Sequence, residues 1–81
     1  MPVKAYILVN VAMGKEHEIR DKISKIPGVK EAHVTYGDWD IIIRAVADRL
    51  ADLDELVWKV RRIDGVTHTS TLVAIREEEV E

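Results

Sequence analysis

The sequence lacks cysteine altogether, so neither disulfide bonds nor thiolate metal ligands can stabilise its fold. It also lacks any apolar run near the roughly eighteen residues that a membrane-spanning helix needs. Its first residues, MPVKAYILVNVA, pass into a patterned strand without a signal-peptide cleavage site. These absences predict a protein of the reducing cytoplasm that neither enters nor crosses a membrane.

An excess of positive charge is missing too. The chain has 12 basic and 15 acidic residues, a net charge of −3, and residues 76–81 form an acidic tail. Nothing in this distribution attracts a phosphate backbone, so direct binding to nucleic acid is not expected. A chain of 81 residues makes a single domain with a modest core, and a domain this small often needs a partner subunit.

What the sequence does contain is a regular alternation of strand and helix patterns. Four segments rich in β-branched residues predict strands: residues 4–12, 30–36, 39–47 and 66–75. Two segments with apolar residues at every third or fourth position predict helices: residues 15–26 and 48–63. The stretches KISKIPGVKEAHVT and KVRRIDGVTHTSTL share one frame, which indicates two strand–helix–strand halves. This predicts an α+β, ferredoxin-like βαββαβ fold, with antiparallel strands in the order 4-1-3-2 and both helices on one face.

Side-chain alternation divides the strands between two faces of the sheet. The face expected to meet the helices carries Ile7, Val9, Val11, Ile41, Ile43 and Ala45. The face expected to stay open carries Tyr6, Leu8, Asn10, Ile42, Arg44, Thr69, Thr71 and Val73. Because this mixture is too apolar for a solvated surface, we expect a homodimer in which sheet packs on sheet. Its predicted interface residues are Tyr6, Leu8, Asn10, Ile42, Arg44 and Val73. The alternative is a monomer with scattered apolar surface residues.

Catalytic and metal-binding patterns are weak. The predicted strand order puts His33 and His68 on opposite edge strands, about three spacings of ~4.8 Å apart, too far to share a metal within one chain. Neither serine lies in a nucleophile turn, and no phosphate-cradling glycine motif is present. Asp38 and Asp40 could form a catalytic pair, but paired aspartates in a turn usually form the turn. We therefore expect no enzyme activity, metal or cofactor.

The stretch YGDWD offers chemistry suited to a small zwitterion. Gly37 can expose backbone N–H groups to a carboxylate, Asp38 or Asp40 can bind an ammonium, and Trp39 can form an apolar wall. The stretch THTST can add the hydroxyls of Thr69 and Thr71, with Ser70 at the rim. An amino acid held between subunits is the predicted ligand. In the alternative, YGDWD is an ordinary hairpin turn and the threonines are simply strand residues.

Trp58 falls off the apolar stripe of the second predicted helix, which consists of Leu53, Leu56, Val57 and Val60. An outward tryptophan predicts a contact between dimers. In the alternative, its ring lies flat on its own helix.

Four stretches carry a family resemblance over most of the chain: AYILVNV, IPGVKEAHVTYGDWDIII, DELVWKVRRIDGV and THTSTLV. In their order and spacing the chain resembles the effector-binding (RAM) domain of Lrp/AsnC regulators. The Gly37 to Asp40 turn and the Thr69 and Thr71 pair match family positions. The resemblance implies dimerisation through the sheets, higher assemblies of dimers, and amino-acid binding near the hairpin turn. It also implies that full-length Lrp/AsnC regulators are partners. The family's N-terminal helix-turn-helix has no counterpart before Lys4, so a stand-alone module without direct DNA contact is expected.

Two other classes share the same element order. An ACT-like regulatory module also binds amino acids but is usually attached to an enzyme. A small dimeric α/β-barrel enzyme would need a deep pocket with a catalytic histidine or acid. Both remain alternatives to the stand-alone module.

Overall fold

The computed structural model describes residues 2–75, and the predicted acidic tail at 76–81 lies outside this range. The elements follow in the order β1 (Val3–Val11), α1 (Glu16–Ser24), β2 (Val29–Val34), β3 (Ile41–Ala47), α2 (Leu50–Arg61) and β4 (Val66–Val73). The strands form one antiparallel sheet in the order β2-β3-β1-β4. The predicted ferredoxin-like fold and strand order are confirmed.

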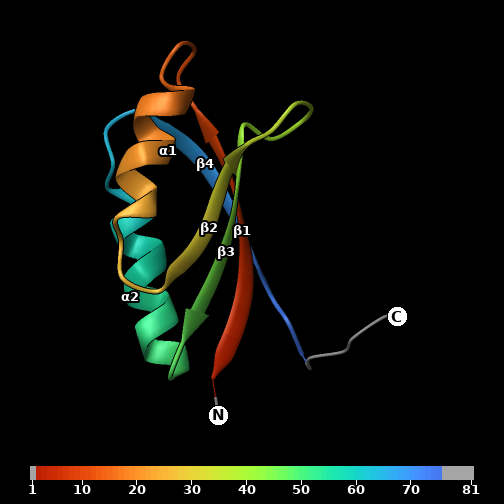
Figure 1. The fold of residues 1–81 in the computed structure, drawn as a ribbon, viewed down its shortest axis with the longest axis vertical. Coiled ribbons are helices and arrows are strands. Elements are labelled where there is room, and N and C mark those ends of the chain that lie inside the picture. The colour runs from red at the N-terminus through yellow and green to blue at the C-terminus, as the bar shows by residue number, and fades with distance from the viewer. Residues whose placement is uncertain (1, 76–81) are drawn as a thin grey trace.

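The sheet has one covered face and one open face. Both helices lie on the same side of the sheet, and no described element covers the other side (Figure 1). We call this uncovered side the open face. Neither helix of residues 2–75 is long and apolar enough to span a bilayer.

The core lies between the helices and the covered face. All six residues predicted to face the helices are buried: Ile7, Val9, Val11, Ile41, Ile43 and Ala45. They pack against the apolar stripes of the two helices, where Ile19, Ile23, Leu53, Leu56 and Val60 are also buried. The apolar residues of the strands and those of the helices thus form one core cluster, because each sequence pattern directs its apolar side chains toward the other layer.

The register of β4 corrects one prediction. Thr69, Thr71 and Val73 lie opposite Val9, Ile7 and Ala5 of β1 respectively, and these β1 residues belong to the core. Residues opposite each other on antiparallel strands share a face. The two threonines and the valine therefore lie on the helix side of the sheet, and their predicted place on the open face is wrong.

The open face instead receives the intervening residues of β4. His68, Ser70 and Leu72 lie opposite Asn10, Leu8 and Tyr6 of β1. Leu72 is 56% exposed and Tyr6 is 44% exposed, so the open face carries uncovered apolar side chains at its centre and toward the β4 edge. Five of the six predicted interface residues lie on this face: Tyr6, Leu8, Asn10, Ile42 and Arg44. The sixth, Val73, does not.

Candidate functional site

The β2–β3 turn projects past the end of the sheet (Figure 1). The Thr35 N–H donates to the carbonyl of Asp40 at 2.8 Å, and the Thr35 hydroxyl donates to the carbonyl of Trp39 at 2.6 Å. Between them Gly37 has φ of +140°, a conformation that favours glycine, and a Cβ there would meet no atom within 4 Å. The turn is thus closed at its base and open at its tip.

Asp40 joins this turn to the end of β1. Its N–H donates both to the Val9 carbonyl at 3.0 Å and to the Asn10 side-chain oxygen at 3.1 Å. Its carboxylate accepts a hydrogen bond from the N–H of Val11 at 2.9 Å. This side chain therefore extends the pairing of β1 beyond the first residue of β3. The third strand begins at Ile41, two residues later than predicted from Trp39.

The Asp40 carboxylate retains capacity for a ligand, because an ionised carboxylate has about four acceptor positions. Asp38 is exposed at the tip, whereas Trp39 and Asp40 are partly buried. The turn therefore presents one carboxylate anchored to β1, on Asp40, and one exposed carboxylate, on Asp38.

One protomer does not bring the whole predicted site together. Val9 of β1 pairs with Ile41 on one side and with Thr69 on the other, so two strand spacings, roughly 10 Å, separate the turn strand from β4. Thr69 and Thr71 also lie on the helix side, whereas Ser70 lies on the open face beside Leu8. Within one protomer, Asp40 and these threonines therefore do not line one common site.

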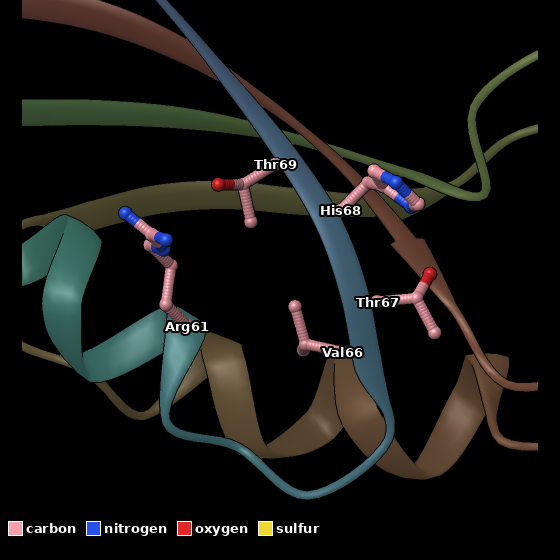
Figure 2. A pocket seen from close by; sticks show the side chains of 5 residues that line it. All are labelled: Arg61, Val66, Thr67, His68 and Thr69. Carbon is pink, nitrogen blue, oxygen red and sulfur yellow. The ribbon is translucent and has the colours of Figure 1, made fainter.

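A hollow of about 420 Å³ lies between the last turn of α2 and the first half of β4. Its lining residues are Arg61, Val66, Thr67, His68 and Thr69. Figure 2 shows Val66 and Thr69 projecting from β4 to the side on which Arg61 of α2 lies, and Thr67 and His68 projecting to the other side. We call this hollow the α2–β4 hollow.

Of the five residues that line this hollow, sequence reasoning predicted Thr69 alone as a ligand residue and missed the arginine, Arg61. Its guanidinium carbon lies 4.6 Å from the centroid of the Trp58 ring. Trp58 is 46% exposed, as its predicted outward position requires. The signal was present in the sequence, since residues three apart on a helix are neighbours and an arginine follows the tryptophan at that spacing.

A smaller hollow of about 210 Å³ lies on the open face and is lined by Tyr6, Glu31, His33, Ile42 and Arg44. The Arg44 Nε donates to Glu31 at 2.5 Å, and His33 lies 3.1 Å from the other oxygen of the same carboxylate. The hydrogen bond from Arg44, and secondarily that with His33, lowers the pKa of Glu31 below its usual value. This face therefore combines apolar area with one charged network.

The strand order places His33 and His68 on opposite edge strands, as predicted. Within residues 2–75, no three histidine, aspartate or glutamate side chains gather in a way that could hold a metal.

The described residues thus form a split βαβ sheet with one open face, a projecting turn that carries two aspartates, and a polar hollow beside α2. The chain belongs to the Lrp/AsnC ligand binding domain family, whose sequence model matches residues 4–79.

Curated relatives include an HTH-type transcriptional regulator of Pyrococcus furiosus, 39% identical over 67 residues, which cover 78% of this chain and 45% of the regulator. The chain thus spans less than half the length of this relative. Among solved structures, hypothetical protein PHS023 from Pyrococcus horikoshii is 43% identical with a TM-score of 0.85, and the match covers 93% of this chain and 92% of that one. A homocitrate synthase of Sulfurisphaera tokodaii is 32% identical over 56 residues, which cover 69% of this chain and 12% of the enzyme.

Proposed function

We propose that this chain is a non-catalytic, amino-acid-sensing module that assembles into dimers and larger oligomers and modulates Lrp/AsnC-type transcription regulators. The observation that carries the proposal is the match of the Lrp/AsnC ligand binding domain to almost the whole chain. A cytoplasmic location and the absence of direct nucleic-acid contact by this domain are parts of the same proposal.

The ligand site uses residues of two protomers. In one protomer Gly37 exposes backbone N–H groups to the ligand carboxylate, Asp38 or Asp40 binds its ammonium, and Trp39 screens both from water. Thr69 and Thr71 of another protomer add hydroxyls, with Ser70 at the rim. Support comes from Asp40, whose backbone makes three hydrogen bonds at the base of the turn and whose carboxylate accepts one from the Val11 N–H. A preorganised group loses little entropy on binding.

The dimer forms through the open face. Tyr6, Leu8, Asn10, Ile42 and Arg44 make the contact. They are joined by Leu72 of β4, which the observed register places beside Tyr6. The support is that this face carries partly exposed apolar residues with no described element over them. Such a patch on a small domain is normally a protein interface.

Trp58 contributes to the contact between dimers. It is 46% exposed on the outer side of α2. In the alternative, the stacked Trp58 and Arg61 pair only covers its own helix. Light scattering on Trp58→Ala separates the two: a smaller assembly supports the contact, and an unchanged assembly contradicts it.

A thermal-shift screen of the twenty amino acids tests the ligand. Because a ligand that binds only the folded state stabilises it by about 2.7 kcal/mol at a hundred times its Kd, the melting temperature should rise by about 10–20 °C for a domain this size. We expect affinities in the micromolar to millimolar range, since a ligand of about ten heavy atoms makes few contacts. The matched controls are the decarboxylated amine and the deaminated acid of each hit. A flat screen would contradict the proposal.

Two alternatives remain for the whole protein. The partial match to a homocitrate synthase favours an ACT-like role, in which such a module serves an enzyme. Affinity capture with the tagged chain tests this: recovery of a biosynthetic enzyme in place of full-length Lrp/AsnC regulators would support it. A small dimeric α/β-barrel enzyme would consume candidate substrates in the presence of oxygen. We expect no turnover.

A further inference from the structure

We propose that the α2–β4 hollow is a recognition site for the carboxylate of a small organic acid, with the Arg61 guanidinium as its central contact. That the acid is an amino acid rests on the proposed function, whereas the site itself does not. None of the predicted ligand residues supplies a cation for the carboxylate, and Arg61 fills that role.

The hollow has the size and lining for this ligand. Its volume of about 420 Å³ falls within the roughly 300–1,000 Å³ of small-molecule sites. Val66 lies opposite Val11 and packs against the core, so it gives the hollow an apolar floor. Arg61 and Thr69 project to the same side of β4 as this floor (Figure 2). A carboxylate placed between them would meet a cation and a hydroxyl donor.

Arg61 is exposed and contacts Trp58 without using its hydrogen-bond donors. The ring of Trp58 contacts the guanidinium through its face, at 4.6 Å from the ring centroid. Stacking of this kind leaves the in-plane N–H groups free to form a two-pronged contact with a carboxylate. Among residues 2–75, no carboxylate pairs with Arg61, whereas Arg20, Arg44 and Arg49 each contact one. Arg61 therefore offers an oriented and unpaired positive charge.

The edge of the sheet adds a backbone donor. In an antiparallel pair, alternate residues direct their N–H and C=O groups toward the same neighbour. The Ala74 N–H donates to the Lys4 carbonyl of β1 at 2.8 Å, so the even-numbered residues of β4 bond to β1. Thr69 therefore directs its N–H away from β1, and β4 is an edge strand. Because Thr69 lines the hollow, this N–H is the backbone donor nearest to the proposed ligand along the edge of β4.

The surrounding charge favours an anion although the whole chain is negative. Lys59 and Arg61 lie in the last turn of α2, and Arg62 follows. Lys59 pairs with Glu55 at 3.8 Å, which leaves the two arginines as the local excess. The positive charge of Arg61 also interacts favourably with the negative C-terminal end of α2. The Arg61→Lys variant described below keeps this charge, so it separates the helix-end role from ligand binding.

The test is an NMR titration of the 81-residue chain with three probes: sodium acetate, inorganic phosphate and the amino acids. We expect acetate and the bound amino acid to shift the Arg61 Nε–H and the amides of residues 67–69 in a saturable way. Arg61→Gln should weaken amino-acid binding about ten- to a hundredfold, as the loss of a charged hydrogen-bonded contact implies. Arg61→Lys keeps the helix-end charge but loses the planar fork, and it should also weaken binding.

Arg62→Gln is the matched control, because it removes the same charge one residue beyond the hollow lining; it should change affinity less than about twofold. Thr69→Val tests the hydroxyl at nearly constant shape.

Amino acids that shift only residues 37–40 would overturn the site and leave the proposed function standing. Acetate that shifts Arg61, with no amino acid binding more tightly, would support the site and contradict the proposed function. Three further results would overturn the proposal: no saturable shift with any probe, phosphate binding more tightly than acetate, or an Arg61→Gln variant that changes assembly size without changing affinity.

Discussion

Two substitutions of Asp40 separate its part in the turn from its part in binding. Asp40→Ala removes the acceptor of the Val11 N–H, a bond of 2.9 Å in a partly buried position. Loss of a bond to a charged group costs about 1.5–3 kcal/mol. For a domain of 60–100 residues each kcal/mol lowers the melting temperature by about 4–8 °C, so a fall of roughly 6–24 °C is expected.

Asp40→Asn keeps an acceptor oxygen at the same distance along the side chain and removes only the charge. Because a neutral hydrogen bond has about half the strength of a charged one, the cost in stability should be about 1 kcal/mol. The charge-assisted contact with an ammonium is lost in both variants. We therefore expect both variants to lose about 1.5–3 kcal/mol of ligand binding, and only the alanine variant to lose much stability.

Calorimetric titration of the ligand and thermal melts on the two folded variants measure both quantities. One result would refute the reasoning: Asp40→Asn with wild-type affinity beside Asp40→Ala with a lowered melting temperature. That combination would make YGDWD an ordinary turn that does not contact the ligand.

Leu8→Lys places a charge on the open face without disturbing the buried core. Light scattering at micromolar concentration should therefore find a dimer for the wild type and a folded monomer for the variant. A monomeric wild type would contradict the proposed interface. Gly28→Ala should lower the free energy of unfolding by about 1–3 kcal/mol, because φ is +96° and the new Cβ would lie 2.8 Å from a leucine side chain of α2. Gly14→Ala, with φ of +88° and no neighbour within 4 Å, is the control and should cost less. Arg44 lowers the pKa of Glu31, so this pair contributes stability above the unfolded carboxyl pKa of about 4.5 and loses it as the pH falls through the lower folded value. NMR titration should show the Glu31 pKa rising in Arg44→Gln; an unchanged value would refute the assignment.

The fold was predictable because two independent periodicities agree. β1 and β3 alternate apolar and mixed residues, and the helices repeat apolar residues every third or fourth position, so each element has one face that must be buried. The predicted core residues Ile7, Ile43 and Val60 are all fully buried. The four glycines with positive φ lie between or after these elements, where the sequence predicted the turns.

The face of β4 was not predictable from its own residues. THTST contains no strongly apolar residue to mark the buried side, and a shift of one residue moves every side chain to the other face. The register also changes between Asn10 and Val11, where Thr67 has no partner on β1. In a strand of small polar residues with an irregular register, the pairing with the neighbouring strand decides which side chains face the core. That pairing is known only from the folded sheet.

The sequence by itself therefore determined the element order, the core and the chemical character of the YGDWD turn, because these depend on residues close together in the chain. Only the tertiary structure decided that Asp40 is anchored to the end of β1, that Thr69 faces the helices, and that Arg61 shares a hollow with it. These relations join residues far apart in sequence. They are fixed by strand register and by the packing of α2 on the sheet, which no local pattern encodes.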